Sequence, residues 1–156
     1  MMQVSSRTEY GIRCLLLLSL QEKGKTLSLS QITRQESLPR HYVEQIFLKL
    51  RRAGFIKSIR GTQGGFALSM PAAEISLGAV IRVLEGVPFT QTCSRFNRGT
   101  DCGHLTRCSI RPVWDLIADR LWNALGQISL QHLVNDEQTV TQTLARELPA
   151  IKVTHD

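Results

Sequence analysis

The sequence contains no long hydrophobic run. Its most apolar stretch, residues 14–18, is far too short to cross a bilayer, which takes about 20 apolar residues in a helix. The residues on either side of this stretch are also wrong for a secretory signal. These absences predict a cytoplasmic protein with no membrane partner. Thiols in that compartment stay reduced, so disulfides are rare there.

Motifs of catalysis are also missing. No nucleophile–base pair, no paired carboxylates and no phosphate-binding loop stand out in the chain. The glycines of residues 61–65 stand between two strand patterns, whereas a phosphate loop leads from a strand into a helix. We therefore predict that the protein is not an enzyme. The rival interpretation is an enzyme, or a carrier that passes a metal cluster to an acceptor.

Acidic residues are scarce in the first half of the chain. Residues 1–70 carry eleven Lys and Arg but only four Asp and Glu, a net charge of +7. Residues 71–156 carry eight Lys and Arg and nine Asp and Glu, a net charge of −1, so all of the excess positive charge lies in the first half. Such asymmetry indicates a polyanion-binding module joined to another part. The alternative is a generic basic surface.

Two capping-box patterns predict the starts of helices near the N-terminus. Ser6 and Glu9 open a helix that extends to about Leu20, and Ser28 and Gln31 open a shorter one. In such a box, each of the two side chains accepts a hydrogen bond from a backbone N–H that the helix leaves unpaired. The polar spacing therefore places two helices before the first proline.

A third helix is predicted to begin at Pro39 and to end at Gly54, residue types that suit a first turn and a C-terminal cap. Its apolar residues recur at the i, i+3, i+4 and i+7 spacing of a buried face. These residues are Val43, Ile46, Phe47 and Leu50. The other face is polar and basic, which is typical of the recognition helix in a helix-turn-helix. An ordinary helical hairpin with a solvated face is the alternative.

A β-hairpin is predicted directly after the third helix. Phe66, Leu68 and Met70 alternate as a strand with one buried face should, and the glycines before them permit a tight turn. A helix-turn-helix followed by a hairpin makes a winged helix. Arg60 lies at the predicted tip of the wing, where it can enter the negative potential of a minor groove.

Side-chain chemistry assigns roles to the polar face of the third helix. Gln45 can bind adenine through two hydrogen bonds, and Glu44 can accept one from cytosine N4. Arg40, Lys49 and Arg52 suit the phosphates of double-stranded DNA. For Glu44, repelling the wrong base or remaining solvated are the alternatives.

The second half of the chain is predicted to contain a helix over residues 77–85 and a long helix over about 109–128. The long helix carries an apolar stripe that includes Trp114 and Trp122, more than one small domain needs. We predict that it dimerises with its counterpart in a second copy; a purely intramolecular core helix is the alternative. Dimers also double the DNA site that one recognition helix reads.

Four segments follow from these patterns. Residues 1–86 form a winged helix-turn-helix domain, 87–108 a cysteine-rich loop, 109–135 the dimerisation helix with a short terminal helix, and 136–156 a flexible tail. Val140 and Leu144 permit one more helical piece in that tail. The predicted fold class is therefore mostly α, with a small β-hairpin wing.

Three of the four cysteines lie in the loop. Cys93, Cys102 and Cys108 stand among polar residues and glycines, and no long apolar run crosses this stretch. Thiolates favour zinc, copper(I) or iron–sulfur clusters. A cluster-free thiol switch, a zinc site, or a disulfide with a spare thiol are the alternatives. Cys14, on an apolar helix, is predicted to be a core residue.

Over about residues 2–135, the sequence resembles the IscR/NsrR family of iron–sulfur-dependent transcription regulators. The matching segments are SSRTEYGIR, PRHYVEQIFLKLRRAGFI, SIRGTQGGF and AEISLGAVIRVLEG, together with the three cysteines and the long helix after them. The resemblance implies a homodimeric regulator, a repressor, that binds a specific DNA operator. It also implies control by a four-iron or two-iron cluster that senses nitric oxide, redox state or iron supply.

The resemblance also assigns residues on the DNA-binding surface. His41, Glu44 and Gln45 fall at the positions of the recognition helix that address bases. Arg60 and Gly61 fall at the tip of the wing that enters the minor groove.

For the cluster, the resemblance assigns the three thiolates but leaves the fourth ligand open. Arg111 stands where IscR-like members place a histidine, and the gap from Cys93 to Cys102 is longer than in those members. Glu9 matches the position at which NsrR-like members offer a carboxylate from the partner subunit, although it also fits the predicted cap. His104, inside the loop, is a further candidate, with a solvated histidine as the alternative.

Overall fold

The computed structural model describes residues 4–22, 24–61, 64–86 and 109–147. Its elements in chain order are α1 (Ser6–Ser19), α2 (Leu29–Glu36), α3 (Arg40–Arg52), β1 (Ile56–Ile59), β2 (Gly65–Leu68), η1 (Ala72–Glu74), α4 (Leu77–Glu85), α6 (Arg111–Gln127), η2 (Leu130–Leu133) and α7 (Glu137–Glu147). The predicted fold class is confirmed, since these ranges are mostly helical with one antiparallel hairpin. No helix in them is long and apolar enough to span a bilayer.

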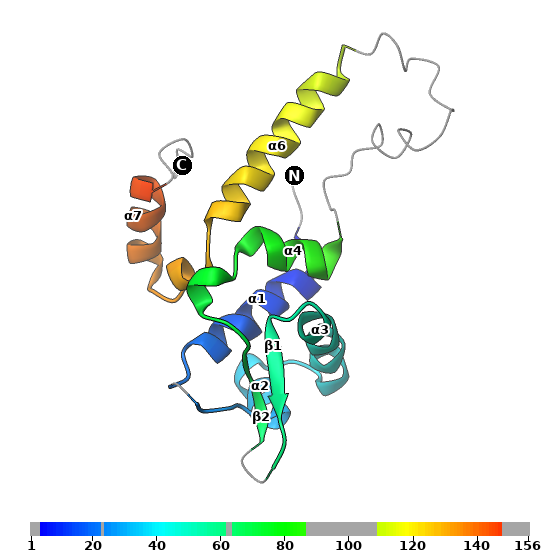
Figure 1. Ribbon diagram of the computed structural model, residues 1–156, viewed down its shortest axis with the longest axis vertical. Coiled ribbons are helices and arrows are strands. Elements are labelled where there is room, and N and C mark those ends of the chain that lie inside the picture. The colour runs from blue at the N-terminus through cyan, green and yellow to red at the C-terminus, as the bar shows by residue number, and fades with distance from the viewer. Residues whose placement is uncertain (1–3, 23, 62–63, 87–108, 148–156) are drawn as a thin grey trace, which may run out of the picture.

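The hydrophobic core lies where α1, α3, α4 and the hairpin meet (Figure 1). Cys14 is fully buried there, as predicted. The periodicity of α3 is also confirmed, because the four apolar residues that predicted its inner face are all buried. Buried side chains of the three helices are Cys14, Leu15, Leu18, Val43, Ile46, Phe47, Leu50, Val80, Ile81 and Leu84.

The start of α1 differs from the predicted capping box. Ser5, not Ser6, is the N-cap, and its hydroxyl oxygen accepts a hydrogen bond from the Thr8 backbone N–H at 3.4 Å. The backbone N–H of Ser5 donates to Oε1 of Glu85, 2.6 Å away at the end of α4. A tertiary contact therefore does the work that the sequence pattern assigned to Glu9, and Glu9 takes no part in the cap.

The turn between α2 and α3 forms as predicted. Ser28 and Gln31 make both hydrogen bonds of a capping box at the start of α2. Ser37 ends that helix in the left-handed conformation, with φ of 54°, and Pro39 is the N-cap of α3. Because α3 begins so soon after α2 ends, its exposed face projects beside α2, as in a helix-turn-helix.

The wing is paired to more than its own two strands. In the hairpin, Ile56 lies opposite Leu68 and Ile59 opposite Gly65. Leu27 and Phe66 also exchange two backbone hydrogen bonds, of 3.0 and 2.8 Å. A side chain at Gly65 would meet the backbone of Leu27, so this close approach requires glycine.

α6 packs on α4 by its C-terminal half and extends away from the rest of the molecule by its N-terminal half (Figure 1). Gly78 permits the close approach of the two helices, since a side chain there would press on the backbone of Leu125 and Gly126. The far half leaves large apolar side chains exposed. They are Ile110, Val113, Trp114, Leu116 and Ile117.

Two short elements follow α6. Ser129 is the N-cap of η2, and its backbone N–H donates to Nδ1 of His132 at 3.2 Å. The short terminal helix predicted after the dimerisation helix is a 3-10 helix of one turn. α7 lies within the segment predicted to be a flexible tail. Asp136 caps it, because a carboxylate oxygen accepts from the Thr139 backbone N–H at 3.0 Å. Val140 and Leu144 are half-buried, which explains why this stretch is helical.

Candidate nucleic-acid interface

The outer face of α3 presents the side chains predicted to address bases. His41, Glu44 and Gln45 are spaced i, i+3 and i+4, so they share one face, and all three are exposed. Arg52 lies on the same side, seven residues after Gln45, and is also exposed. In the described part of the chain, His41 and Arg52 belong to no ion pair. Both are therefore available to a polyanion.

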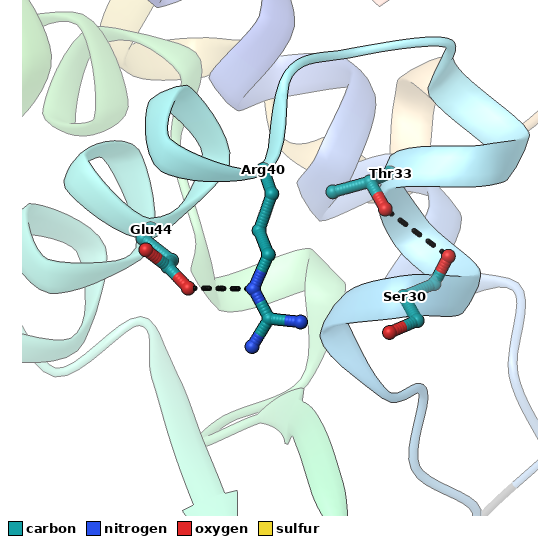
Figure 2. A network of polar contacts seen from close by, with 4 residues as sticks. All are labelled: Ser30, Thr33, Arg40 and Glu44. Carbon is teal, nitrogen blue, oxygen red and sulfur yellow. Dashed lines mark hydrogen bonds and ion pairs between the residues drawn. The ribbon is translucent and has the colours of Figure 1, made fainter.

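Arg40 and Glu44 form an ion pair along this face. The Nε atom of Arg40 lies 2.9 Å from Oε1 of Glu44, one turn further along α3 (Figure 2). Both side chains are well exposed, at 67% and 50%. Arg40 was predicted to bind a phosphate and Glu44 to accept from cytosine, whereas in the structure the two side chains bind each other. The neighbouring polar contact, from Thr33 Oγ1 to the Ser30 carbonyl oxygen at 3.1 Å, lies on α2.

Lys49 does not lie on the polar face of α3. Its Nζ atom donates a hydrogen bond to the carbonyl oxygen of Leu84, 3.1 Å away, and its side chain is half-buried. The last carbonyl groups of a helix have no partner within the helix and carry partial negative charge, which explains the attraction. This geometry does not support the phosphate contact predicted for Lys49.

A basic residue that the sequence analysis left without a role, Arg51, does lie on the outer face. It borders a hollow of about 220 Å³ between α3, the start of α2 and the wing. The other lining residues are Leu29, Glu44, Phe47, Leu48 and Phe66. The sequence already indicated that Arg51 lies on the same face as Glu44, because the two are seven residues, or two helical turns, apart. We add Arg51 to the candidate phosphate contacts.

The wing stands beside α3 because two aromatic rings join them. Phe47 of α3 and Phe66 of β2 meet edge to face, with ring centroids 4.8 Å apart. At the end of β1, Arg60 and Gly61 are exposed, and Gly61 has a φ of 120° that favours glycine. Residues 62–63 lie outside the described part, so the turn of the wing is placed only up to Gly61.

The predicted cluster ligands of the loop, Cys93, Cys102, Cys108 and His104, lie outside the described residues. Within those residues no group of three or more His, Cys, Asp or Glu is placed to hold a metal ion. Burial, with the nearby Glu36 carboxylate, raises the pKa of the Cys14 thiol to about 12, so Cys14 is a poor ligand and nucleophile.

Glu9 is the candidate ligand that the structure does describe. It lies in the first turn of α1 and is exposed, and its carboxylate has no hydrogen bond or ion pair among the described residues. Arg13, one turn later, pairs with Glu36 of α2, with Nε and Oε2 2.7 Å apart. Glu9 thus remains available to a metal, since it is neither a cap residue nor the partner of Arg13.

The end of α4, which directly precedes the undescribed residues 87–108, contacts the start of α1. Burial would raise the pKa of Glu85, but its hydrogen bonds with Ser5 and the charge of Arg7 hold that pKa below its usual value. The Ser5–Glu85 and Lys49–Leu84 hydrogen bonds together join the last turn of α4 to both α1 and α3. Gly86, the last described residue before the cysteine-containing segment, thus lies directly after the point where three helices meet.

The chain is similar to known proteins over most of its length. The model of the Rrf2 family, described as an iron-dependent transcriptional regulator, matches residues 4–136. The HTH-type transcriptional regulator IscR of Vibrio atlanticus is 31% identical over 140 residues, which cover 89% of this chain and 79% of that protein. The predicted resemblance to IscR-type regulators is therefore confirmed.

Solved structures agree with the sequence match. CymR, the global cysteine regulator of B. subtilis, superposes with a TM-score of 0.70 at 30% identity, covering 87% of this chain and 100% of that one. IscR of T. potens superposes with a TM-score of 0.65 at 26% identity, covering 99% and 94%. These likenesses confirm the winged helix-turn-helix and a transcriptional regulator rather than an enzyme. The chain therefore belongs to the Rrf2 family of transcriptional regulators.

Proposed function

We propose that the protein is a cytoplasmic repressor that binds a specific operator in double-stranded DNA under the control of an iron–sulfur cluster. The observation that carries the DNA-binding half is the exposed polar and basic face of α3 beside the wing. The face of α3 fits a major groove, and Arg60 at the end of β1 fits the adjacent minor groove. Arg51 and Arg52 supply charge for the phosphates on either side.

The protein acts as a homodimer through α6. Four large apolar residues on its far half, and Ile110 at its N-cap, are at least 38% exposed in a single copy, an arrangement that costs free energy unless a partner covers it. Trp114 and Ile117 are a single turn apart on that half, as a helix–helix contact requires. A two-fold dimer would also pair two α3 helices on an operator with two half-sites.

The donor set fits a four-iron or two-iron cluster. Three thiolates, Cys93, Cys102 and Cys108, are the soft ligands that iron–sulfur clusters take, and the exposed Glu9 carboxylate of the partner subunit, or His104, completes the set. When bound, the cluster supplies a centre that reacts with nitric oxide or oxygen and depends on iron supply. Glu9 supports this assignment because no contact within the described residues occupies it.

The fold offers a route from the cluster segment to the DNA-binding face. The segment begins after the last turn of α4, which is bonded to Ser5, the N-cap of α1, and to Lys49 of α3. It ends at the start of α6, the proposed dimer helix. A signal changes operator binding only if the cluster-bound and cluster-free forms of the segment differ in how strongly they favour the contacts of α4 with Ser5 and Lys49.

The test is to purify the full chain without oxygen and to measure its absorbance, iron and sulfide. Mass spectrometry under non-denaturing conditions then gives the subunit count and the mass of the bound cluster. We expect a dimer with one cluster in each copy, and footprinting is expected to show protection of a two-fold symmetric site that changes on exposure to nitric oxide. Folded wild-type protein without iron or sulfide would contradict the sensing mechanism but not the DNA binding.

A cluster-free regulator is the second candidate. Its thiols would form a redox switch or hold zinc, and Arg95, Arg98 and Arg107 would favour reactive thiolates. One observation favours it: CymR of Staphylococcus aureus, which is 30% identical to this chain, has been solved in an oxidized form. Stoichiometric zinc without sulfide, or operator binding that responds only to disulfide formation, would select this candidate.

A further inference from the structure

The Arg40–Glu44 pair determines which donors of the arginine remain available. Glu44 Oε1 contacts Arg40 through Nε, the nitrogen inside the side chain, at 2.9 Å. Figure 2 shows the two terminal nitrogens of Arg40 on the side of the guanidinium away from Glu44. Neither makes a hydrogen bond or ion pair with the described residues. The pair therefore leaves the terminal fork of the arginine free.

A free arginine fork at this place matches one base. Arg40 is the first residue of α3, and the N-terminal residues of a recognition helix are the ones that contact base edges. The fork that Nη1 and Nη2 form binds O6 and N7 of guanine through two hydrogen bonds, the commonest specific contact in the major groove. We infer that Arg40 reads a guanine of the operator and that Glu44 is the residue that positions its guanidinium. This rests on the proposed DNA-binding function.

The charge of Glu44 supports a positioning role over direct base contact. A lone carboxylate on this face would lie close to phosphates of the same sign, whereas the pair with Arg40 cancels its charge. The pair is exposed and therefore contributes little to the stability of the free protein. Its effect is to fix the plane of the fork before DNA binds, so that less side-chain freedom is lost in the complex.

The first experiment is selection of binding sites from random duplex DNA by the full chain, purified without oxygen, as wild type and as Arg40→Ala. We expect the variant to lose its preference for guanine at one position of each half-site, by about 5- to 150-fold, while the other positions keep theirs. Uniform weakening on all sequences, with a salt slope smaller by about one phosphate, would overturn the inference and assign Arg40 to the backbone.

Base analogues then separate the two residues, because guanine and its paired cytosine change together in any selection. Replacing that guanine with 7-deazaguanine removes the N7 acceptor, which should weaken wild type and leave Arg40→Ala unaffected. Blocking the opposite cytosine with an N4-methyl group should change wild-type binding little. Strong sensitivity to the methyl group that disappears in Glu44→Ala would show that Glu44 reads cytosine directly, and would overturn the inference.

The positioning role of Glu44 is tested by a conservative substitution. Glu44→Ala should lower the guanine preference, and Glu44→Gln should restore most of it, because the amide oxygen can still accept from Nε. Equal loss in both variants would contradict positioning. Lys25→Ala is the matched control, since it breaks an exposed ion pair of 2.6 Å with Glu22, away from α3. If wild type selects no sequence at all, the proposed function fails, which is a distinct outcome.

Discussion

The Nζ atom of Lys49 lies 3.1 Å from the carbonyl oxygen of Leu84, so the recognition helix α3 is bonded to the last turn of α4. The contact joins residues that are 35 positions apart in the chain. It also turns Lys49 away from the outer face of α3, the face that we propose contacts DNA. Arg51, two residues later, takes the exposed position instead.

Lys49 and Arg51 should therefore behave differently when each is replaced with alanine. Lys49→Ala should lower the free energy of unfolding by about 1 kcal/mol, because a charged donor to a half-buried carbonyl is lost. It should leave the salt dependence of operator binding nearly unchanged. Arg51→Ala should leave stability unchanged and reduce the slope of log K against log salt by about one. Urea unfolding and binding titrations at several salt concentrations measure the two effects.

The exposed half of α6 gives a test of the proposed dimer. Ile117→Glu places a charge on a side chain that is 48% exposed in a single copy. If that face is free, the change should alter the free energy of unfolding by no more than about 0.5 kcal/mol. If it is a dimer contact, the buried and unpaired charge should make the dimer dissociate into monomers. We expect sedimentation velocity to show folded monomers and operator affinity to fall. Gln127→Glu, at the other end of α6, is the control and should remain dimeric.

Thiol reactivity should divide the four cysteines. Burial and Glu36 raise the pKa of Cys14 to about 12, so at pH 8 this thiol is protonated and inaccessible. In native protein freed of metal, iodoacetamide should label Cys93, Cys102 and Cys108 but not Cys14. Peptide mapping by mass spectrometry measures this, with urea-unfolded protein as the control that labels all four. Rapid native labelling of Cys14 would mean that the core opens readily around α1.

The contact between Ser5 and Glu85 should depend on pH. Because the pKa of Glu85 is lowered in the folded protein, its contribution to stability is present above the unfolded pKa of about 4.5 and is lost as pH falls through the folded value. The effect should be well below 1 kcal/mol, since the contact is exposed. Urea unfolding of wild type and Glu85→Gln between pH 3 and pH 7 should give curves that converge in acid. Parallel curves would contradict this.

Two helical glycines should respond oppositely to alanine. A side chain at Gly11 would meet the buried Leu84, so Gly11→Ala should destabilise the protein by about 1–3 kcal/mol through overpacking. Gly126 has open space around it, so Gly126→Ala should stabilise α6 by about 0.5–1 kcal/mol. Thermal unfolding compares them, and equal effects would show that α1 does not approach α4 as closely as described.

Sequence patterns predicted the elements whose causes are local. The capping box at Ser28, the buried stripe of α3, the turn at Pro39 and the hairpin follow from side chains within a few residues of one another. The predicted capping box of α1 was wrong, because the backbone N–H of its N-cap, Ser5, donates to Glu85, which is distant in the chain. No local pattern could have indicated that partner.

In the candidate site, too, the features with local causes could be predicted from the sequence. Spacing alone placed His41, Glu44 and Gln45 on one exposed face, which the structure shows. The contact of Lys49 with Leu84 could not be predicted from the helical spacing, because it depends on the location of α4, whose sequence is 35 positions away. The Arg40–Glu44 pair has the i, i+4 spacing that the sequence already contains, although a search for base contacts passed over it.

The backbone pairing of Leu27 with Phe66 has a mechanical consequence. It fastens the hairpin to the segment that leads into α2, and the Phe47–Phe66 rings fasten it to α3 as well. The two parts proposed to contact the grooves of DNA, α3 and the hairpin, are therefore joined by both backbone and ring contacts. In the proposed mechanism, a signal that shifts α3 is therefore expected to shift the hairpin with it, so that both groove contacts weaken together.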